Sequence, residues 1–180
     1  MAKLITLIVD FLLAPFWYNT SRLPKKIEAV WVLSGPELRV SGNNGKRIRK
    51  GLQVARRHRA AYFIFNGVRE QNRQLKRYLA KSKKWMFRIV IFDSNKGRRG
   101  NTREQVQTLA ARKNLAALQP MVIVSNLPHL PRVKRYLDFF RMLKNQTYLV
   151  GVGSLLDKEL TIISELRKLI RYSQIGDLRL

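Results

Sequence analysis

The sequence predicts a single α/β domain of three layers, in which helices cover both faces of a mostly parallel five-stranded sheet. Five short runs rich in β-branched and aromatic residues alternate with five longer segments whose apolar residues recur at helical spacing. Strands that alternate with helices are typical of a parallel sheet. The length of 180 residues fits one domain, and no internal repeat or linker divides the chain.

The predicted elements follow one another in strict alternation. The strand-like runs are Ala29–Leu33, Ala61–Phe65, Phe87–Phe92, Met121–Val124 and Tyr148–Val152. The helical segments are Arg47–Arg57, Gln71–Lys81, Thr102–Leu118, Leu130–Leu143 and Leu155–Ile170. This order is that of a Rossmann-like domain, for which we set the bounds at residues 27–180.

Two of the helices have well-marked starts. Asn101 precedes Thr102-Arg103-Glu104, so an asparagine cap with Glu104 at the third helical position makes a variant capping box. Pro128 and Pro131 flank the start of the helix that holds Arg132, where a proline removes no needed donor. Both helices begin just after strands, so their free backbone N–H groups and positive dipole ends suit an anion in a shared crevice.

Residues 1–26 precede the domain as an apolar helix and a basic connector. Leu4–Tyr18 is strongly apolar, but Asp10 interrupts it and Pro15 would kink or end a helix. Fifteen residues fall short of the roughly 20 that span a bilayer, and a signal peptide is poorly matched. The sequence leaves two interpretations open: a helix packed on the domain's own core, or an in-plane anchor on an anionic membrane. We expect a cytoplasmic protein, free or at the inner face of the membrane.

The charge is extreme: the net charge is +25 and the pI is near 11.4. Residues 39–113 hold twenty-two of the thirty-six Lys and Arg but only three acids, Glu70, Asp93 and Glu104. Such a balance implies an anionic partner, namely nucleic acid, anionic lipid or a phosphorylated ligand; a merely solvated basic surface is the alternative. The chain has no cysteine, which excludes thiol catalysis and thiolate zinc sites, and its two histidines give a metal site little support.

Polar residues gather where the predicted strands end. Met121–Arg132 runs from an apolar strand into a tip that carries Ser125, Asn126, His129 and Arg132. In open α/β sheets ligands bind at the carboxyl ends of the strands. Because parallel strands bring these ends to one edge of the sheet, we expect the scattered tips to converge.

Four stretches of the sequence resemble motifs of one bacterial protein family. They are VWVLSGPE (Val30–Glu37) with the later Arg47-Ile48, FIFNG (Phe63–Gly67), GNTREQ (Gly100–Gln105) and VSNLPHLPR (Val124–Arg132). The last is the most specific, because it keeps the spacing of the family pattern Val-Thr-Ser/Asn-x-x-His-x-x-Arg. On these motifs, residues 29–172 resemble the YdcF-like/SanA-like/ElyC-like envelope proteins, a domain family whose biochemical role is mostly unassigned.

The chain departs from that family before the Asn-Thr motif, where the family usually has Glu and Ser. Lys96 and Arg99 stand at those positions here. Either Asp93 and Ser94 take the roles of the family's Glu and Ser across a longer loop, or the acid is lost and basic groups replace it.

Strand-end placement and the resemblance together define a candidate site. His129 and Asp93 are the candidate catalytic residues, with His129 as acid or base, although a capping or packing role is an open alternative for His129. The candidate ligand-binding residues are Ser34, Gly35, Arg47, Asn66, Gly67, Asn101, Thr102, Ser125, Asn126 and Arg132. Arginine forks suit phosphate or carboxylate, but Arg132 has the alternative of a structural bridge to Asp93 or Asp138.

The leading hypothesis is a domain that binds a phosphate-bearing ligand, nucleotide-linked or lipid-linked, with a role in bacterial cell-envelope biogenesis that the resemblance implies. Turnover, as a phosphoester hydrolase or transferase, stays open. No sequence motif identifies a cofactor: a Gly-x-Gly-x-x-Gly turn and a phosphate loop are both missing. The alternatives are a non-enzymatic nucleic-acid-binding protein and a peripheral protein of anionic membranes.

Overall fold

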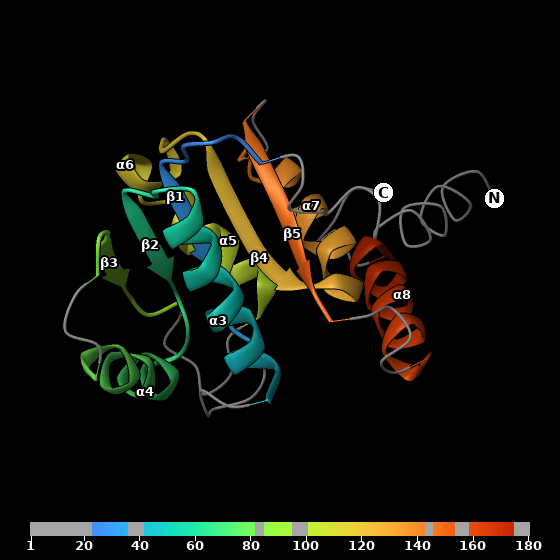
Figure 1. Ribbon diagram of the computed structural model, residues 1–180. Coiled ribbons are helices and arrows are strands. Elements are labelled where there is room, and N and C mark those ends of the chain that lie inside the picture. The colour runs from blue at the N-terminus through green and yellow to red at the C-terminus, as the bar shows by residue number, and fades with distance from the viewer. Residues whose placement is uncertain are drawn as a thin grey trace.

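The computed structural model describes residues 23–35, 42–81, 85–94, 101–142, 146–153 and 159–174. In these ranges five strands form one sheet and helices alternate with them (Figure 1). The strands are β1 (Ala29–Val32), β2 (Tyr62–Phe65), β3 (Arg88–Ile91), β4 (Met121–Asn126) and β5 (Thr147–Val152). The helices are α3 (Gly42–Arg57), α4 (Arg69–Ala80), α5 (Thr102–Ala110), α6 (Lys113–Ala116), α7 (Leu130–Phe139) and α8 (Glu159–Gln174), and the 3-10 turn η2 spans Leu127–His129.

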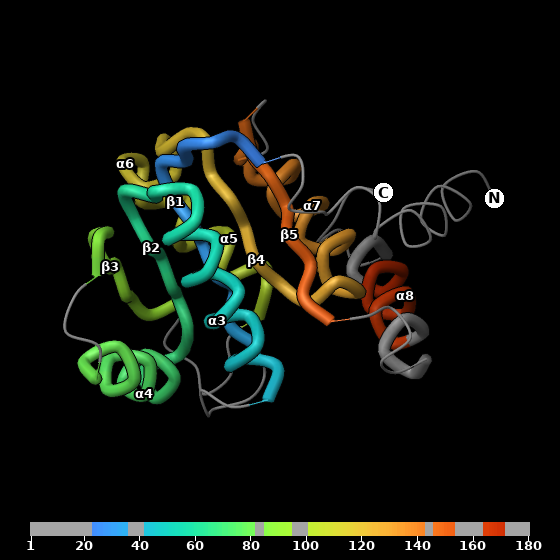
Figure 2. Tube along the Cα trace, in the orientation of Figure 1, coloured from blue at the N-terminus to red at the C-terminus, as the bar shows by residue number. Residues whose placement is uncertain are grey.

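The sheet has the strand order β3-β2-β1-β4-β5, and every neighbouring pair is parallel. The predicted Rossmann-like α/β fold is therefore confirmed, with a sheet that is wholly rather than mostly parallel. The chain starts at the central strand β1, moves outward to β2 and β3, and returns to the other side of β1 as β4. The connections after β1 and β4 thus leave the sheet in opposite directions, which makes the carboxyl ends of these two strands the topological switch point (Figure 2).

Two apolar clusters, one on each face of the sheet, hold the layers together. On one face Val30, Val32 and their neighbours pack against α3 and α4 through residues such as Leu52 and Leu75. On the other face, alternate residues of the same strands pack against α5, α7 and α8, as the period of two in a strand requires. Every residue of β1 is buried, because this central strand is covered on both faces.

Helix α3 lies unusually close to the sheet at Gly51. A Cβ placed on Gly51 would overlap the Cγ2 atom of Val32 and come within 3.2 Å of the Phe63 ring. The missing side chain therefore sets the distance between α3 and β1, and this distance in turn brings Arg47 to the end of the sheet.

The predicted elements differ from the observed ones mainly at one helix. The segment predicted as a single helix over residues 102–118 is divided into α5 and α6, because Arg112 between them has non-helical backbone angles (φ −92°, ψ 74°). Its guanidinium lies 4.2 Å from the centre of the Phe92 ring, a tertiary contact that helical periodicity does not reveal. The apolar segment over residues 4–18, with the expected N-terminal helix, lies outside the described residues. Within the described ranges, no helix combines the length and the apolar character that crossing a membrane requires.

Candidate functional site

A cavity of about 370 Å³ opens at the crevice between the ends of β1 and β4. Eight of the candidate residues line it: Ser34, Gly35, Arg47, Asn101, Thr102, Asn126, His129 and Arg132. They come from segments that are far apart in the sequence, so the expected convergence of strand ends holds for these eight. Asn43, Gln105, Pro128, Ser164, Glu165 and Lys168 complete the lining.

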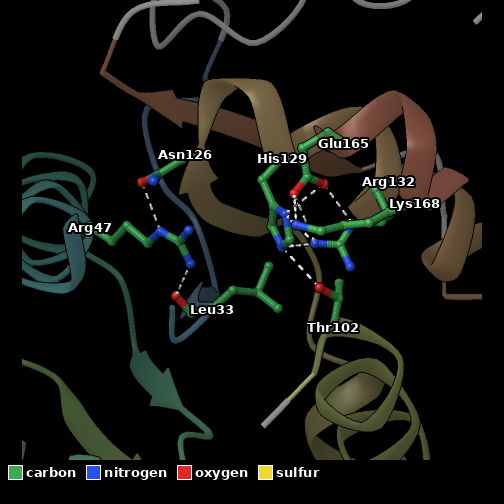
Figure 3. Close-up of polar contacts among 8 residues, drawn as sticks. All are labelled: Leu33, Arg47, Thr102, Asn126, His129, Arg132, Glu165 and Lys168. Carbon is green, nitrogen blue, oxygen red and sulfur yellow. Dashed lines mark hydrogen bonds and ion pairs between the residues drawn. The ribbon is translucent and has the colours of Figure 1, made fainter. Parts of the chain in front are cut away.

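Glu165 of α8 organises one wall of the cavity. Its Oε2 accepts a hydrogen bond from Arg132 Nε at 2.7 Å, and its Oε1 accepts one from Lys168 Nζ at 2.8 Å (Figure 3). The side chains of Glu165 and Arg132 are only 6% and 8% exposed. Burial by itself would raise the pKa of Glu165, but the charge of Arg132 and the hydrogen bond from Lys168 hold this pKa below its usual range. Glu165 is therefore ionised, and its carboxylate holds the Arg132 guanidinium in place.

His129 sits between Arg132 and the start of α5. Burial and the neighbouring charge of Arg132 lower the pKa of His129 to about 3, so the ring is neutral at physiological pH. Arg132 Nη2 lies 2.8 Å from His129 Nδ1 and, as a guanidinium nitrogen, can only donate. We therefore assign Nδ1 as the acceptor and place the proton on Nε2, which lies 2.8 Å from Thr102 Oγ1. In this tautomer Nε2–H donates to Thr102, and the hydroxyl hydrogen of Thr102 stays available.

Arg47 and Asn126 form the opposite wall. Arg47 Nε donates to Asn126 Oδ1 at 2.8 Å, and Nη1 donates to the carbonyl oxygen of Leu33 at 3.1 Å (Figure 3). Arg47 is buried, with 4% of its surface exposed. The end of β1 and the end of β4 are thus joined by one arginine from α3.

The turn after β1 is held by amide side chains. Gln105 accepts a hydrogen bond from Ser34 N at 3.2 Å and donates to Ser34 Oγ at 2.9 Å. Asn44 accepts from Gly35 N, and Gln71 donates to the Gly35 carbonyl oxygen at 2.7 Å. The backbone of this turn is therefore fixed from three helices.

The first turn of α5 begins as the sequence predicts. Asn101 is the N-cap, and its side chain accepts a hydrogen bond from Glu104 N at 2.9 Å. The capping hydrogen bond therefore occupies Asn101 Oδ1. Asn101 and Thr102 also line the cavity. The capping and lining roles of Asn101 thus occur together.

Four candidate residues lie at strand ends but do not line the cavity. Asn66 is fully buried: it accepts from the Trp31 indole at 2.7 Å and donates to the Gln105 carbonyl oxygen at 2.7 Å. Gly67 exchanges backbone hydrogen bonds with the side chain of Asn72. The side chain of Asn66 thus ties β2 to β1 and α5.

Ser125 and Asp93 are the other two. Ser125 is fully buried, and its hydroxyl has no hydrogen-bond partner in the described part of the chain. Asp93 follows the edge strand β3, which β2 and β1 separate from β4; it is exposed and accepts from Asn72 Nδ2 at 2.6 Å. The structure therefore does not bring Asp93 to His129.

The most informative residue that the sequence analysis missed is Glu165. The structure gives Arg132 this partner, where sequence spacing had offered Asp93 or Asp138. Glu165 lies 33 positions after Arg132 on a helix that resembles an ordinary amphipathic segment. Gln105 was also missed as a lining residue, although it stands within the GNTREQ stretch. Only the packing of α8 beside α7 could have indicated Glu165.

The polar side chains of the site divide by their hydrogen-bonding capacity. Six lining side chains have acceptors that already receive hydrogen bonds within the protein: Ser34, Thr102, Gln105, Asn126, His129 and Glu165. In contrast, Arg132 Nη1 and Asn126 Nδ2 have no partner among the described residues, and Lys168 Nζ donates only to Glu165. The three cations Arg47, Arg132 and Lys168 face one carboxylate. The cavity therefore offers donors and positive charge.

These features define a Rossmann-like α/β domain with a cationic, donor-rich cavity at its topological switch point. The described residues contain no group of three or more His, Asp or Glu that could hold a metal ion. Comparisons with protein-family models, with curated proteins and with solved structures give no match to this chain.

Proposed function

We propose that this protein binds a phosphate-bearing ligand in the cavity between β1 and β4. The observation that carries the proposal is the imbalance of the lining. Arg132, Asn126 and Lys168 have donor hydrogens without a partner among the described residues, whereas the acceptors beside them already receive hydrogen bonds. A phosphate oxygen is an acceptor, and its charge complements three cations against one carboxylate. A neutral sugar would instead need acceptors for its hydroxyl groups.

The first turns of two helices support the same ligand. Asn43 and Thr102 stand in the first turns of α3 and α5, and both line the cavity. The unpaired N–H groups and the positive end of the macrodipole at such helix starts favour an anion.

Binding has more support than turnover. A general base near neutral pH needs a free lone pair and a pKa near the working pH. His129 has neither, because Nδ1 accepts from Arg132 and the pKa is about 3. A bound phosphate would raise that pKa by its charge, so phosphoester hydrolysis or transfer through His129 is the extension of this proposal.

The resemblance of residues 29–172 to the envelope family would assign this ligand to cell-envelope biogenesis, as a nucleotide-linked or lipid-linked phosphate. We extend the proposal accordingly to a cytoplasmic protein that works free or at the inner face of the membrane. If residues 4–18 attach the protein to the membrane, a variant that lacks residues 1–18 should no longer co-sediment with anionic vesicles.

The test is Asn126→Asp, which changes one donor to an anion at almost constant shape. The carboxylate still accepts from Arg47 Nε, so the fold is retained, while a negative charge replaces the Nδ2 donor inside the cavity. Inorganic phosphate and pyrophosphate should bind the parent protein in isothermal titration calorimetry and bind the variant at least about tenfold more weakly.

The matched control is Asn114→Asp, because Asn114 is exposed on α6 outside this cavity and the change of charge is the same. The control should bind phosphate like the parent protein. Equal binding to the parent and to Asn126→Asp, or an equal loss in the control, would remove the proposed site.

A further inference from the structure

A dense group of positive charges lies outside the cavity, on the outer side of α3 and α4. Eight basic side chains of these two helices are exposed: Lys46, Arg49, Arg56, Arg57, Arg69, Arg73, Lys76 and Arg77. Glu70 is the one acid in either helix, and it pairs with Arg73 at 2.9 Å. Apart from Arg73, none of these eight cations forms an ion pair with a carboxylate in the described part of the chain.

A groove runs through this charged surface. It has a volume of about 550 Å³ and is lined by Arg49, Leu52, Gln53, Arg56, Arg57, Tyr78 and Trp85. We call this the α3–α4 groove. Its charged residues are all arginines, whose planar forks bind phosphate by two hydrogen bonds. Arg49 and Arg57 have no ion-pair or hydrogen-bond partner in the described ranges.

Trp85 contributes an aromatic ring to the lining of the groove. The guanidinium of Arg56 lies 4.6 Å from the centre of the Trp85 ring, and Trp85 Nε1 donates to the Leu79 carbonyl oxygen at 3.1 Å. Trp85 also packs against Phe87, with ring centres 5.4 Å apart. Trp85 is thus fixed in place, with Arg56 held against it.

Tyr78 gives the groove a second, more accessible aromatic surface. Its side chain lies at the groove with 40% of the residue surface exposed. A surface that binds single-stranded nucleic acid has two parts. Positively charged side chains contact the phosphate backbone, and exposed aromatic rings stack against the bases.

We infer that the α3–α4 groove binds single-stranded nucleic acid without sequence preference. The concave shape favours a strand over a bilayer, which is flat and would contact protruding apolar groups. The site is separate from the cavity between β1 and β4: Arg47 faces that cavity from α3, whereas Arg49, Arg56 and Arg57 line the groove. The cations of this surface that have no ion pair among the described residues also repel one another, and a polyanion relieves that repulsion.

The experiment measures binding of fluorescent oligouridylate and oligothymidylate of about 12 nucleotides, within the roughly 4–16 that single-strand-binding domains cover. Fluorescence anisotropy is recorded over a series of salt concentrations. The test variant is Arg49→Gln/Arg57→Gln. Each phosphate contact contributes about 0.7 to the salt slope of a single strand, so this variant should lower the slope by about 1.4.

The control variant is Arg88→Gln/Lys113→Gln, which removes the same charge from exposed residues at a different cavity, beside α6. Its salt slope should equal that of the parent protein. Tyr78→Ala should weaken binding about tenfold at unchanged melting temperature, while Tyr78→Phe keeps the parent affinity because the stacking ring remains.

Three results would overturn the inference. One is an equal fall of the slope in both double variants, which would indicate diffuse attraction. Another is binding of neither oligonucleotide by the parent protein, or binding only of vesicles that contain phosphatidylserine. The third is parent-like affinity in both Arg49→Gln/Arg57→Gln and Tyr78→Ala. Asn126→Asp should keep oligonucleotide binding, so failure at the groove and failure at the cavity are distinguishable.

Discussion

Replacing Glu165 by glutamine should lower stability and strengthen anion binding at the same time. Glu165 and Arg132 are both more than nine-tenths buried, and their closest contact is 2.7 Å. Glutamine keeps the shape but leaves the Arg132 guanidinium buried without a counter-charge. Breaking a buried ion pair from one side costs about 3–5 kcal/mol. For a chain of this length about 2–4 °C accompany each kcal/mol, so the melting temperature should fall by about 6–20 °C.

The opposite effect on binding follows from competition. Glu165 is the anion that occupies Arg132 and Lys168 in the structure. Without it, these cations attract an external phosphate more strongly. A ligand present at about one hundred times its dissociation constant restores about 2.7 kcal/mol. Added phosphate should therefore raise the melting temperature of Glu165→Gln by more than that of the parent protein.

Urea unfolding followed by circular dichroism gives the free energy of unfolding. Thermal scans with and without phosphate show how much phosphate raises the melting temperature of each protein. Glu70→Gln is the control: it removes an exposed pair with Arg73 and should cost less than about 0.5 kcal/mol. The reasoning fails if Glu165→Gln costs no more than Glu70→Gln, or if phosphate stabilises the parent protein and the variant equally.

Three further predictions follow from the structure. The pKa of His129 is lowered to about 3 in the folded protein, so the unfolded chain binds more protons between that value and the ordinary 6.5, and stability should rise with pH across this window. Between pH 5 and 6.5, where Glu165 stays ionised in both states, urea unfolding should show a slope of at most about 1.4 kcal/mol per pH unit that His129→Gln reduces. Gly51→Ala should destabilise by about 1–3 kcal/mol, because its Cβ overlaps Val32; unchanged urea unfolding would contradict the close approach of α3. Ser125→Ala should stabilise by about 1 kcal/mol, because a buried hydroxyl without a partner is removed, and a loss of stability would show that the hydroxyl has a partner.

The sequence was sufficient for the parts of this molecule that depend on local pattern. The strand β4 and the polar residues after it are predicted from the sequence alone, because the apolar segment Met121–Val124 is followed directly by Ser125 and Asn126. The cap at Asn101 is equally local, since its side chain bonds to Glu104 three residues later. A parallel sheet then places the polar residues at the ends of β1 and β4 on the same edge, at the switch point.

The rest depends on contacts between distant segments. Asn66 stands at a strand end like Asn126, but the side chain of Asn66 is buried in the core, where it accepts a hydrogen bond from the Trp31 indole. Glu165 contacts His129 from a helix whose own pattern is that of any amphipathic helix. No periodicity distinguishes these cases, because each depends on how the layers pack.

The position of Glu165 on α8 gives the cavity an order of assembly. A ribosome completes β1, β4 and α7 before it reaches α8, so Arg132 is synthesised well before Glu165, the carboxylate that balances its charge. Until α8 docks, the Arg132 guanidinium at that wall lacks the carboxylate that holds it in the folded protein. Docking of α8, the last described helix, is therefore also the step that completes the wall of the cavity.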